Sequence, residues 1–525
     1  MLNKVGYPKT TNNVLKPSKF QKVILSAERL GNKIPHPLTI FIILIAILFI
    51  ISHFTQGIVV KLPGTDDEII TQSLLKADFV RSFLKNIPKN FVDFPALRYA
   101  LVIILGTAVC EYSGLFNAVM KRFVANASNT LIATIVVFLS LNGNLIGDSA
   151  FVFIPTLAGV VYAAKGRNPI LGIATSYACV NGGHSAAIMF GSSDAILYGI
   201  TESVMQLLPI TQNYSAHVAM NWYFLAVSAI LLTPVAVYVS EKIIAPIVEG
   251  SDVFNVDKDI DYYAEAGLSE LEPIEHKGLK YAGISLLTYI IIILVLTIPQ
   301  GAFFRNTDTG NILPKSPFMD SIVMLMTFLF LIPGITYGIT VGKIKKDRDV
   351  ANYMVKGITS MAGFIVIVFG ASQFVACFKD TNLATLIAIR GTEFIKAINL
   401  KDVPLVIVFI LFMSFLNLFV VSASAKWAMV APIFVPMFAL LGYSPAFAQA
   451  LYNVGNSCTN IITPLSSGLA IVLGMMSRYK KDTGLGTLIS LMIPFSIAFL
   501  FFWTALSIIF LLFNLPLGPN AGIYL

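Results

Sequence analysis

The chain has 525 residues, of which 56% are hydrophobic and only 12% are charged, and its mean hydropathy is +0.79. Ordinary soluble proteins carry about 25% charged residues, because a surface that faces water needs polar side chains. The composition therefore excludes an ordinary soluble protein and indicates a chain embedded in lipid. The net charge of +8 does not indicate nucleic-acid binding, since the basic residues gather at the ends of apolar segments.

Several apolar runs approach or reach the roughly 20 residues that a helix needs to span a bilayer. They lie at residues 37–54, from 96 onward, and at 222–239, 281–298, 318–339, 403–421 and 485–513. Such segments recur to the end of the chain, which excludes a single cleaved secretory signal as their explanation. The sequence predicts an all-α, polytopic membrane protein.

Basic residues indicate how the chain is oriented, because lysine and arginine are enriched on the cytoplasmic side of membranes. Residues 1–34 are rich in both and predict a cytoplasmic N-terminal arm. The acidic stretch at 249–275 lies between Lys242 and Lys277 and is expected to be a cytoplasmic loop. The last apolar segment starts after Lys481, which predicts a C-terminus outside and an odd number of crossings.

Two parts of the chain repeat one pattern, an Asn/Ser-rich element ending in proline followed by a second polar interruption. The four stretches are NGNLIGDSAFVFIP (142–155) with NGGHSAAIMFGSSD (181–194), and NLFVVSASAKWAMVAPIFVP (417–436) with NVGNSCTNIITP (453–464). Corresponding broken hydrophobic segments in two halves are typical of a transporter binding site. The identity between the halves is weak, so the repeat is one of pattern.

This pattern predicts the organisation of the chain. We expect a first transmembrane half at residues 35–248 and a second at 350–518, each with a re-entrant hairpin and a broken helix. A linking pair of helices at 276–349 would join them. The second interruption, in YNVGNSCTNIITP, is expected to face the first near residues 181–185, with Pro464 fixing its turn.

The polar interruptions need a physical reason, because backbone at membrane depth is tolerated outside a helix only where it lines a cavity or is buried in protein. Asparagine and serine there supply amide and hydroxyl groups, and helix N-termini attract anions. Small residues also let helices pack closely, which explains isolated serines and glycines. That alternative explains the clusters SASAKW and NSCTN poorly, so we predict a substrate or ion site.

Ionisable residues inside apolar segments are further candidates, because a charge buried in a membrane is costly. Asp148 and Asp194 are two such acids, and Asp148 has an alternative as a helix cap. For His184 two roles are open: a group that changes its charge near neutral pH, or a polar residue of the interruption whose hydrogen bonds are satisfied. Glu111 is expected near the cytoplasmic end of its span, with a structural role.

Motifs of other function classes are missing from the sequence. The stretch GITVGKI at residues 338–344 has the wrong spacing for a phosphate-binding loop, and neither HExxH nor GxSxG occurs. The four cysteines lie far apart and suggest neither zinc nor disulfides. We expect no enzyme and no cofactor, except a coupling sodium ion or proton. A channel is the main alternative, although channels commonly repeat one pore element around an axis.

Four longer motifs resemble the AbgT family, whose members are described as p-aminobenzoyl-glutamate transporters or antimetabolite exporters. The motifs are PHPLTIFII (35–43), GGHSAAIMFGSSDAILYGIT (182–201), VSASAKWAMVAPIFVPM (421–437) and YKKDTGLGTLISLMIPFS (479–496). The resemblance runs in order from about residue 22 to residue 518. Because these motifs are long and specific, they are not a chance match.

The resemblance implies a bowl-shaped homodimer in a bacterial inner membrane. Each protomer would have about nine transmembrane helices and two re-entrant helical hairpins, built as inverted repeats. The implied function is secondary active transport of a small aromatic carboxylate-bearing solute, such as p-aminobenzoyl-glutamate or a related folate-pathway compound. Transport would be driven by an ion gradient through alternating access, and export of sulfonamide-type antimetabolites is the alternative.

The family pattern also implies site residues, by the motifs in which they stand. These are Asp194 in GSSDA, Asn417 in FLNLF, Ser422, Ser424 and Trp427 in SASAKW, Pro445 in YSPAF and Pro464 in IITP. Trp427 is amphipathic and either stacks on an aromatic substrate or marks a membrane interface, and its place in the serine cluster favours stacking. Asn181, Asn460 and Lys426 are further candidates, and Lys426 either supplies positive charge to the site or extends to the membrane interface.

Two positions depart from the family pattern, which has an arginine and an aspartate where this chain has Asn453 and Asn456. Removing one partner of a buried ion pair leaves an unpaired charge, which costs about 3–5 kcal/mol. Replacing both keeps the segment neutral, and an asparagine amide still donates and accepts hydrogen bonds. We therefore interpret the stretch as a rebuilt site.

Overall fold

The computed structural model describes residues 35–61, 68–125, 131–212, 214–250, 271–313, 316–480 and 484–525. The arm expected at 1–34 and most of the acidic loop expected at 249–275 lie outside these residues. Within them, regular structure is helical apart from one two-stranded antiparallel sheet. Its strands, β1 (Val59–Lys61) and β2 (Glu68–Ile70), pair Val60 with Ile69.

Eight helical stretches of the described residues are long and apolar enough to cross a membrane, judged by length and composition. They are α2 (Pro37–Phe54), α3 (Ala77–Val92) with α4 (Pro95–Ser113), α11 (Trp222–Tyr238) with η2 (Val239–Ile244) and α12 (Ala245–Glu249), α14 (Pro273–Thr297), α16 (Ile322–Thr340), α18 (Ala362–Thr381), α21 (Ala423–Leu440) and α24 (Leu485–Leu512). The described residues also contain three shorter apolar helical stretches, at 132–145, at 150–163 and in α20 (Asp402–Asn417), and the expected count of nine crossings stays a prediction. The predicted all-α, polytopic membrane fold is confirmed.

Both halves repeat one order of elements. The first contains α6 (Ile132–Leu141), η1 (Asn142–Ser149), α7 (Ala150–Ala164), α8 (Pro169–Gly182), an interruption and α9 (Ser192–Met205). The second contains α20, an irregular turn, α21, α22 (Pro445–Cys458), an interruption and α23 (Ser467–Tyr479). The neighbours also correspond, because α6 packs on α8 and α11 as α20 packs on α22 and α24. This is the expected repeat of one re-entrant pair and one broken helix.

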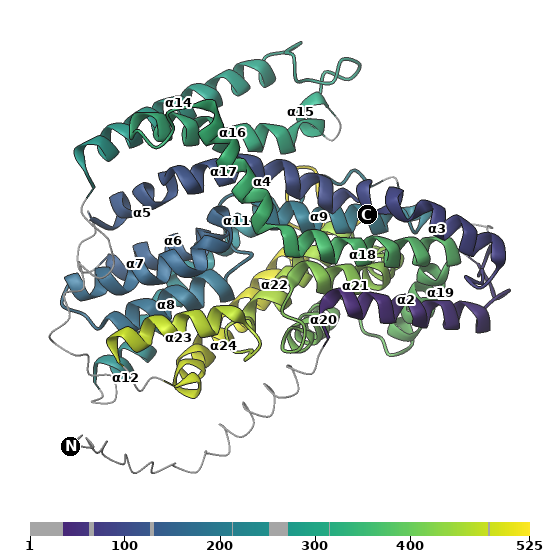
Figure 1. Cartoon of the computed structure of the whole chain (residues 1–525). Helices are drawn as coiled ribbons and strands as arrows, with labels where there is room; N and C mark the ends of the chain where they lie inside the picture. Colours follow the sequence, from purple (N-terminus) through teal and green to yellow (C-terminus); the bar gives the residue numbers. More distant parts are fainter. Residues whose placement is uncertain are drawn as a thin grey trace, which may run out of the picture.

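The other helices connect or flank these repeats. They are α5 (Leu115–Ala125), α10 (Pro209–Gln212), α15 (Pro317–Asp320), α17 (Asp347–Ser360) and α19 (Leu383–Ala397). Figure 1 shows α14 and α16 side by side along one edge of the molecule. A side chain at Gly106 of α4 would collide with the backbone of Thr327, so this glycine permits close packing of α4 on α16.

The broken helices begin with the same chemistry in both halves. Asn168 caps α8, where its Oδ1 atom accepts a hydrogen bond from the Ile170 N–H at 2.9 Å. Ser444 caps α22 by accepting from the Phe447 N–H at 3.1 Å, and Pro445 occupies the first helical position. Proline suits that position, because its missing N–H would have no partner inside the helix. Pro445 therefore lies at the start of α22, at the opposite end of this helix from the second interruption.

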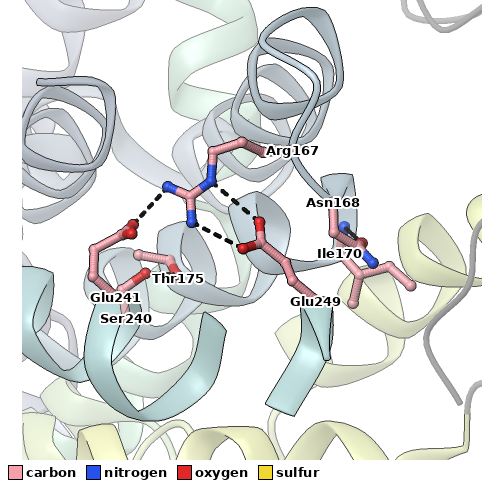
Figure 2. A network of polar contacts seen from close by, with 7 residues as sticks. All are labelled: Arg167, Asn168, Ile170, Thr175, Ser240, Glu241 and Glu249. Atoms are coloured by element: carbon pink, nitrogen blue, oxygen red, sulfur yellow. Dashed lines mark hydrogen bonds and ion pairs between the residues drawn. The ribbon is translucent and has the colours of Figure 1, made fainter. Parts of the chain in front are cut away.

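A charged cluster holds the start of α8 to the end of α11 (Figure 2). Arg167, in the turn between α7 and α8, places Nη1 2.8 Å from Oε1 of Glu241 in η2 and Nε 3.1 Å from Oε1 of Glu249 in α12. Its guanidinium also lies 5.0 Å from the centre of the Tyr162 ring. The π-helical turn η2 carries Glu241, and such turns are frequent at functional sites. We call these four residues the Arg167 clasp.

The C-terminal segment, residues 514–525, packs on both halves. The Phe224 N–H donates to the Leu517 carbonyl at 3.0 Å, and the Ser444 N–H donates to the Ile523 carbonyl at 2.8 Å. Phe224 belongs to α11 of the first half, whereas Ser444 precedes α22 of the second. We call this segment the C-terminal strap.

Candidate functional site

The two interruptions face each other inside the protein, as expected from the sequence. Residues 183–191 separate α8 from α9, and residues 459–466 separate α22 from α23. The Asn460 amide donates to the Asn181 carbonyl at 3.4 Å, and the Asn181 amide donates to Ser466 Oγ at 3.3 Å. One turn before the second interruption, the hydroxyls of Ser457 and Ser185 lie 3.2 Å apart.

The turn between α20 and α21 connects to this junction through Asn417. Asn417 Nδ2 donates to Thr459 Oγ1 and to Asn460 Oδ1, both at 2.9 Å. Its amide oxygen accepts from the ammonium of Lys426, which also donates to the Val420 carbonyl at 3.1 Å. The second hairpin, the second interruption and the first interruption therefore form one hydrogen-bonded network.

A first cavity of about 380 Å³ opens beside the junction. Its polar lining comes from Asn181, His184, Asn460 and Ser466, three of which the sequence predicts as site residues. The Phe151 ring also lines it and stacks on the His184 ring, with centroids 6.0 Å apart and planes 20° from parallel. An aromatic surface beside amides and a hydroxyl suits a solute with a ring and polar groups.

A second cavity of about 360 Å³ shares His184 with the first, because this residue lines both. Ser422 and Ser424 line it, as expected of the serine cluster, and their hydroxyls lie 3.4 Å apart. Ser192 and Ser193, from the first turn of α9, line it as well. Glu111, for which the sequence predicts a structural role near the end of its span, also lines this cavity.

Asp194 is buried at the start of α9, where its Oδ2 atom accepts a hydrogen bond from the Gly191 N–H at 2.8 Å. The carboxylate thus caps the helix that follows the first interruption, beside the serines of the second cavity. A negative charge at a helix N-terminus is favourable, because it meets the positive end of the helix dipole. Asp148 belongs to η1, and its side chain lies outside the part of the structure that is described.

Trp427 lines neither of the two cavities. Its side chain is fully buried, and its ring stacks on Tyr452 with centroids 4.4 Å apart and planes 29° from parallel. Its Nε1–H donates to Thr201 Oγ1 at 2.9 Å, and Thr201 donates to Gln449 at 2.6 Å. A tyrosine of this chain therefore occupies the ring face that the sequence suggested for an aromatic substrate.

Asn453 and Asn456 lie one turn apart on α22 and are both fully buried. Neither amide atom of Asn453 has a hydrogen-bond partner among the described residues, and neither has Nδ2 of Asn456. Asn456 Oδ1 accepts a hydrogen bond from the Tyr452 hydroxyl at 3.4 Å. Buried amides without partners are uncommon, because each loses its hydrogen bonds to water without replacement. They mark unused hydrogen-bonding capacity beside the junction.

Several contact residues are absent from the sequence-based set. They are Ser185, Ser457, Thr459 and Ser466 at the junction, with Asn144, Ser192 and Ser193 at the second cavity. Most stand inside the polar stretches that the sequence analysis predicts to form the site. The sequence therefore indicated the segments, but not which individual serines make the contacts. No group of three or more His, Cys, Asp or Glu side chains in the described residues is placed to hold a metal ion.

Comparisons with known proteins agree with this architecture. The family model described as "AbgT putative transporter family" matches residues 22–525. The p-aminobenzoyl-glutamate transport protein of Escherichia coli (strain K12) is 34% identical over 502 residues, which cover 95% of this chain and 96% of that protein.

Two solved structures are similar over nearly the whole chain. The YdaH transporter of Alcanivorax borkumensis, whose topology is described as unusual, has a TM-score of 0.86 and 33% identity, covering 92% of this chain and 100% of that one. MtrF of Neisseria gonorrhoeae, described with a class of antimetabolite efflux pumps, has a TM-score of 0.86 and 36% identity, covering 93% and 98%. On this evidence the chain belongs to the AbgT family of transporters.

Proposed function

We propose that this protein is a secondary active transporter of a small aromatic solute bearing carboxylates, such as p-aminobenzoyl-glutamate or a related folate-pathway compound. The observation that carries the proposal is the junction of the two interruptions, with two polar cavities that share His184 in their lining. Each cavity has a volume in the range of small-molecule sites. A site between two repeats suits alternating access, because one repeat can move against the other.

The driving force would be a gradient of sodium ions or protons. Asp194 is a buried ionisable group beside the junction, and such groups are functional candidates in a membrane protein. The protein would sit in a bacterial inner membrane with its N-terminus in the cytoplasm and its C-terminus outside. Exposed apolar residues on α14 suit contact with lipid or with the second protomer of a homodimer.

Export of sulfonamide-type antimetabolites is the second candidate, favoured by the resemblance to MtrF. Both candidates predict a carrier, whereas a channel would conduct without saturation. The deciding experiment uses purified protein in proteoliposomes, with labelled p-aminobenzoyl-glutamate or labelled sulfonamide. Sodium and proton gradients are imposed separately, and liposomes without protein are the control.

Saturable uptake above the control, accelerated by one of the two gradients, would support the proposal. Accumulation of the sulfonamide alone would favour the efflux function instead. Single conductance steps in planar bilayers, with no saturable accumulation of either solute, would replace the carrier with a channel.

A further inference from the structure

Lys426 is a lysine whose whole side chain is buried in the first turn of α21. A buried ammonium loses its hydration, so it is stable only where other groups replace the water. Among the described residues, no carboxylate forms an ion pair with its Nζ atom. It therefore neither extends to the membrane interface nor belongs to a conventional salt bridge.

The groups that replace water around the ammonium are neutral oxygens at the end of α20. They are Oδ1 of Asn417, the last residue of that helix, and the carbonyl of Val420 in the turn that follows. The Tyr452 ring adds its face, with its centre 5.9 Å from Nζ. A helix C-terminus carries a partial negative charge, and unwound carbonyls at such ends coordinate Na⁺ in other transporter folds.

Two other carbonyls at this end of α20 have partners from the second interruption. Ser414 O accepts from the Thr459 hydroxyl and Leu418 O from the Thr463 hydroxyl, both at 3.0 Å. The ammonium thus lies among polar contacts around the helix end, bound by oxygens of the kind that also coordinate a monovalent cation.

The ammonium also fixes the orientation of an amide that joins the halves. Because Asn417 Oδ1 binds Lys426, its Nδ2 atom is directed at Thr459 and Asn460. Asn460 in turn donates to the Asn181 carbonyl of the first half. A positive charge at this position therefore supports the hydrogen bonds that close the junction.

We infer that Lys426 is a built-in cation that takes the place of a sodium ion at the end of α20. The protein binds no Na⁺ at this position and needs none there to keep the two interruptions joined. Direct anchoring of a solute carboxylate by Lys426 is the rival role. The rival is disfavoured because Lys426 lines neither cavity and its ammonium is already bound by two oxygens of the protein.

The test measures cation binding in the full-length purified protein without any transported solute, so its outcome does not depend on the proposed function. Thermal unfolding midpoints are compared in sodium chloride and N-methyl-D-glucamine chloride at equal ionic strength, with binding of radioactive Na⁺ measured in parallel. The proteins are wild type, Lys426→Ala, Lys426→Arg and Lys379→Ala, a control at an exposed lysine of α18.

Wild type, Lys426→Arg and the control should show the same response of Tm to Na⁺, because a coupling sodium site elsewhere in the protein would be unaltered in all three. Lys426→Ala should lose stability, and Na⁺ alone should restore about 2 °C or more by occupying the freed oxygens. The inference is overturned if Lys426→Ala gains no Na⁺-specific stability or folds in neither salt. It is also overturned if wild type binds Na⁺ and Lys426→Ala abolishes that binding. If Lys426→Ala responds to Na⁺ as wild type does, a separate measurement of the affinity for a carboxylate solute tests the anchoring role.

Discussion

At the scale of single residues, Ser424 differs from a serine that only helps helices to pack. It lines the second cavity beside Ser422, whereas exposed Ser490 of α24 donates to the Thr487 carbonyl of its own helix. Loss of a hydrogen bond to a charged solute costs about 1.5–3 kcal/mol, roughly ten- to a hundredfold in affinity. We expect Ser424→Ala to raise the apparent KM for the solute by that factor.

Proteoliposome uptake at varied solute concentration measures this effect, with Ser490→Ala as the matched control. Unchanged apparent affinity and rate in Ser424→Ala would reduce the serine cluster to helix packing.

Asn453 and Asn456, which stand where the family pattern has a charged pair, lead to a second prediction. Asn453→Arg alone should lower stability by about 3–5 kcal/mol, because it buries a charge without a partner. Asn456→Asp should cost less, since the Lys426 ammonium lies over the ring of Tyr452, which contacts Asn456. The double variant should be more stable than the sum of the two single losses. A double-mutant cycle on Tm and uptake measures the coupling, and additive losses would mean that the two positions do not interact.

The sequence predicted where polar residues gather better than it predicted what each side chain contacts. Asn181, Asn460 and Ser424 line the cavities as expected, because polar groups inside an apolar chain are tolerated where they line a cavity or are buried in protein. The sequence could not place Trp427 or Glu111, since a contact with Tyr452 or a cavity wall depends on how distant helices pack.

At the scale of elements, the repeat could be predicted from the sequence because each broken helix carries its own capping residues, polar turn and proline. The packing of α6 and α20 on their neighbours could not be predicted, because apolar helix surfaces in lipid show little hydrophobic periodicity. The Arg167 clasp was missed for a related reason. Its carboxylates stand more than seventy residues from the arginine and come into reach only once α11 packs on α6 and α8 packs on α12.

The clasp gives a third prediction, on stability. The side chains of Arg167, Glu241 and Glu249 are 20%, 30% and 36% exposed, so their ion pairs lie between surface pairs and buried pairs in strength. Arg167→Ala should therefore lower the free energy of unfolding by about 1–2 kcal/mol. Arg167→Lys should recover only part of that, because lysine lacks the planar fork that meets two carboxylates. Thermal unfolding measures both, with Arg390→Ala at an exposed i,i+3 pair as control. Equal stability of Arg167→Ala and wild type would show that the clasp contributes nothing.

At the scale of the whole molecule, the proposed movement of one repeat against the other would separate the two interruptions during each cycle. Ser185 and Ser457 are the natural place to prevent that separation, with hydroxyls 3.2 Å apart. We expect Ser185→Cys combined with Ser457→Cys, on a Cys458→Ala background, to form a disulfide that blocks uptake and is reversed by reductant. Each single cysteine variant should transport with or without oxidant. Full activity in the cross-linked protein would mean that this contact stays closed throughout the cycle.

The C-terminal strap has a consequence for how the molecule is made. It follows α24 in the chain, yet its hydrogen bonds reach Phe224 in one half and Ser444 in the other. Both halves must therefore be inserted in the membrane before the strap can dock. We therefore expect every newly synthesised copy to pass through a state in which the strap is undocked, and docking of the strap distinguishes that state from the folded protein.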